Sequence, residues 1–340
     1  MLAGVVFVAL MGASIRVHAQ QASNPIARDQ ILRTGLSSDG EVHVMHVQGN
    51  VYMLVGAGGN ITVQAGDDGV LVVDTGVTRM SDKVLAAIKS ISNKPIRYVI
   101  NTSADLDHVG GNEPIAEAGS TIAGGNVVGD IGASAGNQAT VIAAQEVLDR
   151  VSAPTGKEPA IPQGAWPTDT FTTHEKKLYF NGEPVEIIHE PNAHTDGDSI
   201  VFFHKSDVVS TGDIFVTEDY PNIDAARGGS IQGELNALVH VIDLTTVIAM
   251  QEGGTMVIPG HGRLCDQADV VFYQEMVTII RDRIQDMLKK GMTIEQVQAA
   301  NPTMDYDPRY RVDTGPWTTR IFIEAVYNSL KQGPPSEHGQ

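Results

Sequence analysis

Four short segments of the chain gather histidine and aspartate residues that could bind a metal ion. The first contains Asp105, Asp107 and His108, and three such groups in one tight loop are costly together unless a cation holds them. The other segments contribute one residue each, namely His194, Asp213 and His261. Imidazole nitrogen and carboxylate oxygen, with no thiolate among them, favour zinc, manganese or iron over a soft-metal site.

Each of these segments follows an apolar run that predicts a β-strand. The predicted strands cover residues 96–100, 185–189, 208–210 and 255–258. Strand ends are where α/β folds place their functional sites. Alternate residues of an extended loop point to the same side, so the carboxylates of Asp105 and Asp107 can converge. Glycines at positions 110 and 111 allow a following helix to begin close to that loop.

The remaining elements are two leading hairpins, several further strands and a helical C-terminal part. Apolar, β-branched runs predict paired strands at 42–47 and 51–55, then at 61–65 and 70–74. Helical periodicity marks residues 81–92, where Ser81 suits the N-cap, and Thr293-Ile294-Glu295-Gln296 has the form of a capping box. Other helices are predicted at 145–151, 233–244, 268–290 and 317–331, other strands at 141–143, 178–180 and 200–203, and a long loop at 153–170.

These motifs, in this order, resemble those of the metallo-β-lactamase superfamily. Residues 101–112 resemble its signature Thr-His-x-His-x-Asp-His-x-Gly-Gly-Asn, and Asp74-Thr75-Gly76 resembles an early turn that supports the site from behind. Ala193-His194-Thr195, Gly212-Asp213 and Gly260-His261-Gly262 resemble its later ligand motifs. The resemblance covers residues 42–262 and implies a four-layer αβ/βα sandwich, an α/β fold with the metal centre at one edge of two sheets. We expect this domain at 40–265 and a C-terminal helical extension at 266–332.

The first motif departs from the family pattern at two positions. Ser103 and Asp105 stand where the family has its first two histidines, which bind the first metal together with the residue that matches His194. The second metal site of the family uses the residues that match Asp107, His108 and His261, with Asp213 often shared between the metals. The resemblance therefore implies an intact second site and an altered first site.

Two metal contents follow from this pattern. In one, a single ion is bound by four residues: Asp107, His108, Asp213 and His261. In the other, Asp105, His194 and Asp213 hold a weaker second ion, and the carboxylate in place of imidazole shifts the preference toward manganese or iron. We expect zinc as the cofactor, one or two ions per chain, with manganese and iron as alternatives.

The resemblance implies a hydrolase that activates water with a metal and attacks a small carbonyl substrate: a lactam, lactone, ester or thioester, β-lactams included. Asp107 would orient the nucleophile as well as bind metal, and with the first metal site vacant Asp105 or His194 would serve as general base. One alternative is a non-catalytic binding protein on the same fold, which the retained second site disfavours. The other is an iron-dependent oxidoreductase, which Ser103 at the first histidine position disfavours.

The composition and the N-terminus bound the partners and the location. The 340 residues carry a net charge of −18, which repels phosphate backbones and disfavours nucleic acid as a partner. The apolar run Leu2 to Met11, followed by Val17-His18-Ala19, predicts a secretory signal at residues 1–19 and a periplasmic or secreted protein. No later segment has the length to span a membrane. The sequence does not indicate the oligomeric state.

Several other residues have simple structural interpretations. The single cysteine, Cys265, is expected to be a small buried residue. Asp196 and Asp198 are expected to fix a turn through bonds from side chain to backbone, and Ser103 to form hydrogen bonds or fill space. Trp166 and Tyr220 could line a substrate cleft or pack in the interior. The histidines outside the motifs are expected to be structural or exposed: His43, His46, His174, His189, His204 and His240.

Overall fold

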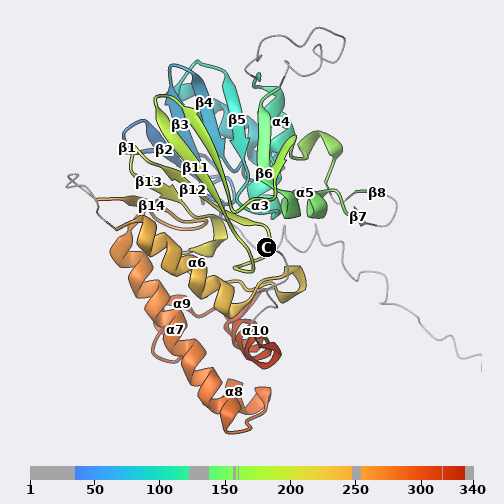
Figure 1. The fold of residues 1–340 in the computed structure, drawn as a ribbon, viewed down its shortest axis with the longest axis vertical. Helices are drawn as coiled ribbons and strands as arrows, with labels where there is room; N and C mark the ends of the chain where they lie inside the picture. Colours follow the sequence, from blue (N-terminus) through green and yellow to red (C-terminus); the bar gives the residue numbers. More distant parts are fainter. Residues whose placement is uncertain are drawn as a thin grey trace, which may run out of the picture.

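The computed structural model describes residues 35–121, 138–155, 158–159, 161–246, 254–315 and 317–333 (Figure 1). The predicted signal segment, residues 1–19, lies outside these ranges. Among the residues that the structure describes, none of the helices combines the length and apolar character that a bilayer crossing requires.

The first sheet has seven strands, in which an antiparallel meander leads into parallel strands. Strands β1 to β4 pair antiparallel in sequence order, and β4, β5, β6 and β9 then pair parallel. The order across the sheet is β1 (His43–Gln48), β2 (Val51–Val55), β3 (Ile61–Gly66), β4 (Gly69–Val73), β5 (Ile96–Ile100), β6 (Thr140–Ala144) and β9 (Asp169–Phe171). Helices in the connections between the parallel strands are α2 (Ser81–Ile91), α3 (Leu106–Val109), α4 (Asn112–Glu117) and α5 (Gln145–Val151).

The second sheet has six strands and one parallel pair. Helix α6 (Ile231–Leu244) lies in the connection between β13 and β14, which are parallel, and the other neighbours pair antiparallel. The order is β10 (Glu175–Phe180), β11 (Glu183–Glu190), β12 (Asp198–Phe203), β13 (Val208–Ser210), β14 (Met256–Ile258) and β15 (Cys265–Asp266). A separate two-stranded piece pairs β7 (Pro154–Thr155) with β8 (Glu158–Pro159).

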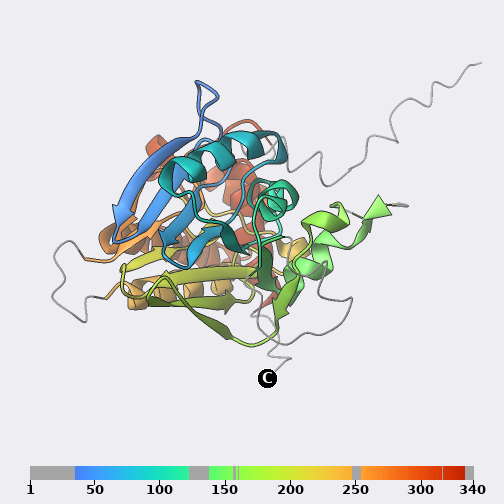
Figure 2. The same cartoon turned by 90° about the horizontal axis from the view of Figure 1, so that it is seen from above.

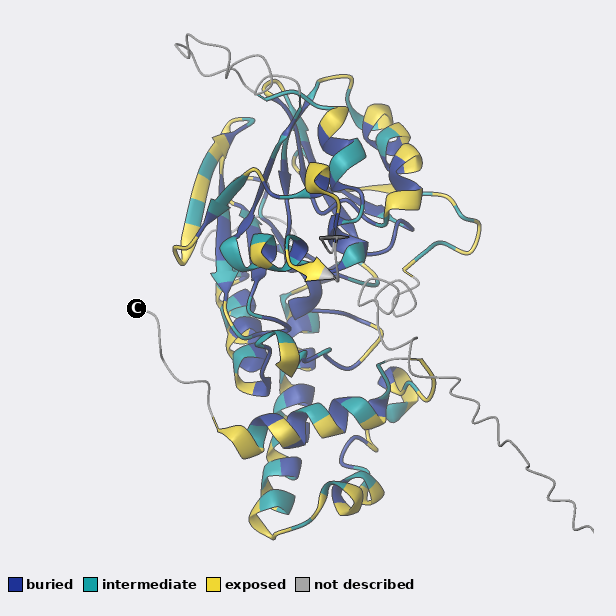
Figure 3. Ribbon diagram, turned by 90° about the vertical axis from the view of Figure 1, so that its right-hand side faces the viewer, coloured by how far each residue is buried: buried dark blue, intermediate teal, exposed yellow. Residues whose placement is uncertain are grey.

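Helices cover the outer faces of two facing sheets, as Figures 2 and 3 show, and three apolar clusters fill the spaces between these four layers. Strand β4 is buried along its whole length, because alternate side chains point to opposite faces of the sheet and both faces are covered. Val72 of β4 packs with the helices outside the first sheet, and Leu71 packs between the two sheets. The third cluster joins the second sheet to α6 and α7, with Val209, Leu238 and Val277 among its members. This arrangement is the expected four-layer αβ/βα sandwich.

The C-terminal part is helical, as the sequence predicts. It comprises α7 (Gln267–Lys289), α8 (Ile294–Ala300), α9 (Asp307–Tyr310) and α10 (Thr319–Gln332). Asp266 and Thr293 cap α7 and α8 through capping boxes, which satisfy amide groups at each helix N-terminus. The cluster that covers the second sheet includes Val277 of α7 and Phe322 of α10, so these helices share an apolar core with the sandwich.

The structure differs from the sequence expectations at a few local positions. Ser81 is the first residue of α2 and not its N-cap, because a short 3-10 turn, η1 (Thr78–Met80), precedes the helix and the Ser81 hydroxyl donates to the Thr78 carbonyl at 2.8 Å. The expected loop at 153–170 contains η3 (Gln163–Ala165), β7 and β8, and β9 begins at its end. Strands of two or three residues are too short to show a period of two.

Candidate metal centre

The six predicted ligands come together at one edge of the two sheets. Asp105, Asp107 and His108 lie on the loop after β5 and on α3, which begins directly after Asp105. The other three lie beyond β11, β13 and β14, with Asp213 in the short 3-10 turn η4 (Gly212–Ile214): His194, Asp213 and His261. All of these segments leave the carboxyl ends of their strands, which meet at the same edge.

The six residues form two neighbouring groups. We call Asp107, His108 and His261 the Asp107 cluster, and Asp105, His194 and Asp213 the Asp105 cluster; the ligand atoms of each lie within 4.8 Å of one another. Asp213 faces both groups. Its Oδ1 atom lies 3.4 Å from His261 Nε2, and its Oδ2 atom lies 3.2 Å from His108 Nε2 and 4.0 Å from His194 Nδ1.

The spacing of these atoms fits a divalent cation. Two ligands on a tetrahedral metal with bonds of about 2.0–2.2 Å lie about 3.3–3.6 Å apart. Nε2 of His261 lies 3.2 Å from Asp107 Oδ2, and Nε2 of His194 lies 3.5 Å from Asp105 Oδ2. Nε2 of His108 and His261 and both ring nitrogens of His194 are buried and lack a hydrogen-bond partner in the described ranges. Buried polar atoms in that state call for an ion, so the two clusters fit a binuclear metal centre.

The electrostatics of the centre also favour a cation. Burial lowers the pKa of His108, but the carboxylates of Asp213 and Asp74 raise it more, so the pKa lies well above its usual range. Burial opposes the same upward shift for His194, whose pKa is raised by Asp105, Asp198 and Asp213. The negative potential that raises these two pKa values also attracts a metal ion, which competes with protons for the same nitrogen atoms.

Asp74 orients the His108 ring from behind, as the resemblance implied. His108 Nδ1 donates to Asp74 Oδ2 at 2.7 Å, which leaves Nε2 directed at the clusters. The same carboxylate accepts from the backbone N–H of Thr102 at 2.8 Å and from its hydroxyl at 2.6 Å. Asp74 has a φ of 63°, a conformation that aspartate and asparagine tolerate better than most residues. A carboxylate behind a ligating histidine sets the tautomer that leaves the other nitrogen available for metal.

Glycines allow the loops to approach closely at two positions. A Cβ atom at residue 260 would lie 2.5 Å from Asp213 Oδ1, so only glycine leaves room for that ligand. Gly212 has a φ of +51°, and a Cβ there would lie 2.5 Å from the Thr102 hydroxyl. These two residues explain why Gly-Asp and Gly-His pairs accompany the ligands.

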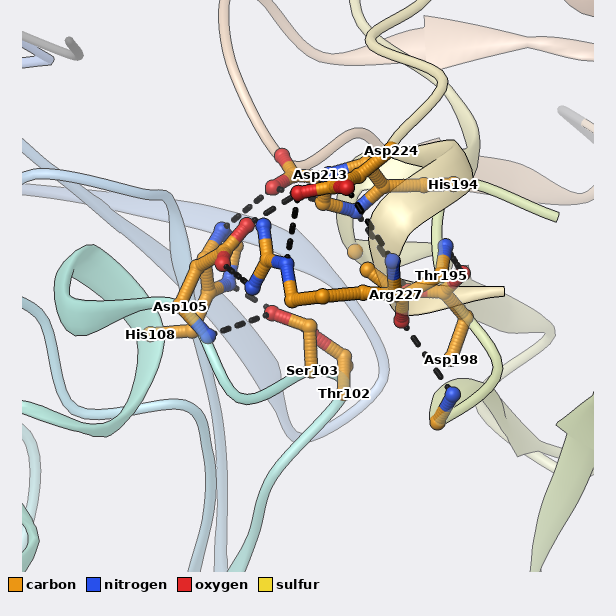
Figure 4. A network of polar contacts seen from close by, with 12 residues as sticks. Thr102, Ser103, Asp105, His108, His194, Thr195, Asp198, Asp213, Asp224 and Arg227 are labelled. Carbon is orange, nitrogen blue, oxygen red and sulfur yellow. Dashed lines mark hydrogen bonds and ion pairs between the residues drawn. The ribbon is translucent and has the colours of Figure 1, made fainter. Parts of the chain in front are cut away.

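Around the altered first motif, the structure reveals a residue that sequence reasoning missed. Ser103 is buried, and its hydroxyl accepts from the Asp105 N–H at 3.3 Å, as expected for a hydrogen-bonding residue. The carboxylate of Asp105 forms an ion pair with the Arg227 guanidinium through Oδ1, while Oδ2 faces His194 (Figure 4). Arg227 lies in the 3-10 turn η5 (Ala225–Arg227). Nothing in the local sequence singles out this arginine, because its partner is 122 positions away.

A second missed residue is Glu234 of α6. Its side chain is fully buried, and neither carboxyl oxygen has a hydrogen-bond partner in the described part of the chain. Burial raises its pKa well above the usual range, and the carboxylates of Asp198 and Asp213 raise it further. This buried carboxyl group lies close to Asp198 and Asp213. Its position in the helical pattern of α6 resembles that of an apolar residue, and only its charge could have drawn notice.

The two aspartates beside His194 have different roles. Asp198 fixes its turn as expected, because its Oδ1 accepts from the Thr195 hydroxyl at 3.1 Å and its Oδ2 accepts from the Thr195 N–H. Its Oδ1 also lies 3.5 Å from His194 Nδ1. The prediction that the Asp196 side chain bonds to the backbone of its own turn was wrong, because its carboxylate pairs with the Arg150 side chain.

Three further side chains, Cys265, Tyr220 and Trp166, pack against the protein interior or its backbone. Cys265 is buried, its thiol donates to the Arg263 carbonyl, and burial raises its pKa to about 12. Tyr220 is 2% exposed and stacks on Phe322, so it belongs to the interior and not to a cleft wall. Trp166 is half-buried and donates from Nε1 to the Ile161 carbonyl at 2.8 Å.

Comparison with known proteins places this fold and centre in a family. A family model described as the metallo-beta-lactamase superfamily matches residues 54–261. A linear primary-alkylsulfatase from Pseudomonas sp. (strain ATCC 19151) is 24% identical over 302 residues, which are 79% of this chain and 55% of that protein. The chain thus spans about half the length of this curated relative.

Solved structures share the fold at low sequence identity. A stereoselective inverting sec-alkylsulfatase from Pseudomonas sp. matches with a TM-score of 0.58 and 15% identity, over 88% of this chain and 52% of that one. A metallo-beta-lactamase from Pontibacter korlensis matches with a TM-score of 0.51 and 14% identity, over 70% of this chain and 99% of that one. The fold and the two clusters of histidine and aspartate, each of which could hold a metal ion, agree with this family match. The chain belongs to the metallo-beta-lactamase superfamily.

Proposed function

We propose that the chain hydrolyses a small ester-like substrate with water activated at the Asp107 cluster. The observation that carries this proposal is the convergence of Asp107, His108 and His261, with Asp213 beside them, at spacings that fit a cation. Carbonyl substrates are the first class: lactams, lactones, esters and thioesters. The fold alone supports many chemistries, so the substrate class is part of the proposal.

The ligands would divide the work as follows. Asp107, His108, Asp213 and His261 would hold zinc, with manganese and iron as alternatives. When bound, zinc supplies a Lewis acid and lowers the pKa of a water ligand to about 7. Asp107 would bind the ion and orient the attacking water through Oδ2, which lies 3.2 Å from His261 Nε2.

His194 is better placed than Asp105 to hold or pass a proton. Its ring lies between two carboxylates, with Nδ1 3.5 Å from Asp198 Oδ1 and Nε2 3.5 Å from Asp105 Oδ2. The Asp105 carboxylate is engaged by the Arg227 guanidinium, which stabilises its charged form and makes it a weaker base. We therefore assign proton transfer to His194 Nε2 and a supporting role to Asp105.

A sulfate ester is the second candidate substrate. The two alkylsulfatases match 79% and 88% of this chain, whereas the metallo-beta-lactamase matches 70%. The larger share indicates that their likeness extends further beyond the domain that the family model covers. This favours testing a primary alkyl sulfate beside the carbonyl substrates.

The proposal is tested by metal analysis and a substrate panel on the same preparation. Protein purified without chelator and dialysed against trace zinc is analysed for metal per chain. It is then assayed with a chromogenic β-lactam, a lactone, a thioester, a carboxylic ester and a primary alkyl sulfate. We expect at least one tightly bound ion and chelator-sensitive turnover in one of these classes.

Asp107→Ala should lose both the tight ion and the turnover, and Asp282→Ala, which removes an exposed carboxylate of α7, should keep both. Full metal content and activity in Asp107→Ala would refute the assignment. Well-folded wild-type protein without any metal would instead support a binding protein. Bound iron with a visible absorption band would support an oxidoreductase.

We also propose that residues 1–19 are a secretory signal and that the protein is periplasmic or secreted. The support is the sequence pattern, an apolar run followed by a small-x-small site at Val17-His18-Ala19. Sequencing the N-terminus of protein from fractionated cells tests this: a mature end near Gln20 in the exported fraction is expected. An intact N-terminus in the cytoplasmic fraction would contradict it.

A further inference from the structure

The segment that carries Arg227 is built against the Asp105 cluster. The Asp224 side chain accepts from the backbone N–H of Ala226 and of Arg227, and from Arg227 Nε at 2.7 Å. The backbone N–H of Asp224 donates to the His194 carbonyl at 2.9 Å. A Cβ atom at Gly229 would lie 2.1 Å from that carbonyl, so the end of the segment lies directly on the His194 loop. The turn thus holds its arginine in a fixed direction (Figure 4).

Neighbouring residues anchor the same turn from the other side. The carbonyl oxygen of Arg227 accepts from Arg150 Nη2 and from the backbone N–H of Asp196, both at 2.8 Å. The Arg150 side chain is itself ion-paired with Asp196. An arginine held through its backbone, its Nε and its Nη1 has little freedom to swing into solvent, although its side chain is 21% exposed.

Asp105 does not need Arg227 to hold its place. Its carbonyl oxygen accepts from the N–H groups of His108 and Val109 at 2.8 and 2.9 Å, and its own N–H donates to the Ser103 hydroxyl. The main chain therefore directs the carboxylate into the centre. Arg227 adds a permanent positive charge that is paired with Asp105 Oδ1. The other oxygen of the same carboxylate, Oδ2, faces His194.

We propose that Arg227 is a built-in cation of the Asp105 cluster that weakens binding of a second divalent metal there, so that the Asp107 cluster fills first. The proposal rests on metal binding at the two clusters, as set out above. A positive charge paired with a ligand carboxylate offsets the negative charge that attracts a metal ion. It also repels the incoming ion directly. Within a few ångströms and with limited access to bulk water, that effect weakens binding at least about tenfold.

A zinc titration of metal-free protein against a competing chromophoric chelator tests this directly, because it reads stoichiometry and affinity without any substrate. Arg227→Met removes the charge and the hydrogen bonds, and Arg227→Gln removes the charge but keeps a donor for Asp105. Arg227→Lys keeps the charge. Arg283→Met is the control, since Arg283 of α7 also forms an ion pair with an aspartate, Asp305 in the turn before α9, but at a more exposed place. Thermal unfolding of each variant checks folding.

We expect wild-type protein to bind one zinc ion tightly and a second at least tenfold more weakly. Arg227→Met and Arg227→Gln should tighten the second ion by about tenfold or more, while Arg227→Lys and Arg283→Met leave it unchanged. A second ion that is unchanged or weaker in the Gln variant would overturn the proposal and make Arg227 a support for its ligand. Wild-type protein that binds no zinc would instead refute the proposed function, so the two failures are distinct.

Discussion

Replacing Asp74 by asparagine is expected to weaken metal binding at the Asp107 cluster while leaving the local backbone in place. Asparagine tolerates the φ of 63° at this position as aspartate does. Its amide oxygen can still accept from the Thr102 N–H. The amide nitrogen, however, would face His108 Nδ1, which now donates to a carboxylate oxygen at 2.7 Å. Two donors cannot bond, so His108 must place its proton on Nε2, the atom directed at the metal.

The size of the effect follows from the contacts that are lost. The carboxylate accepts three hydrogen bonds, and its partners Thr102 and His108 are 1% and 0% exposed. A hydrogen bond to a charged group contributes about 1.5–3 kcal/mol, and loss of an outer partner of a ligating histidine costs about 10–100-fold in metal affinity. At about 1.4 kcal/mol per tenfold, the affinity loss corresponds to about 1.4–2.8 kcal/mol.

The assay is a competitive zinc titration of Asp74→Asn beside a closely matched control. Asp207→Asn serves as that control, because Asp207 also has a positive φ, of 55°, and accepts from a threonine hydroxyl, that of Thr255, at 2.8 Å. Asp207→Asn should bind zinc as wild type does. If Asp74→Asn bound its first zinc ion as tightly as Asp207→Asn, the argument that this carboxylate sets the His108 tautomer would be wrong.

Two further predictions concern stability. Glu234→Gln is expected to stabilise the protein increasingly as pH rises, because the raised folded-state pKa of Glu234 means that the unfolded chain alone releases the proton above about pH 4.3. The difference in the free energy of unfolding between the variant and wild type should grow by up to about 1.4 kcal/mol per pH unit until the folded-state pKa is reached. Urea unfolding measures this difference at pH 5.5 and 8, and equal values at the two pH values would contradict the prediction. Tyr220→Phe removes the hydroxyl that donates to Asp307 Oδ1 at 3.0 Å and should lower the free energy of unfolding by about 1.5–3 kcal/mol, as measured by the same method; an unchanged value would show that the hydroxyl does not help dock α9.

Much of the fold could be read from local patterns. The strands of the first two hairpins and the capping box at α8 depend on residues close in sequence, through period-two apolar runs, turn formers and the Thr293–Gln296 spacing. Short elements escaped for the opposite reason. β9 has three residues and gains its place by pairing with β6, which no local pattern records.

The sequence by itself singled out the six candidate ligands and Asp74, because each sits in a short motif at a strand end. Only the tertiary structure decided how they share the centre: Asp213 faces both clusters, and Asp105 is paired with Arg227. It also placed the buried carboxyl group of Glu234 near Asp198 and Asp213. These relations join residues far apart in the chain, and the strength of a charge interaction depends on distance and burial in space, not on spacing along the sequence.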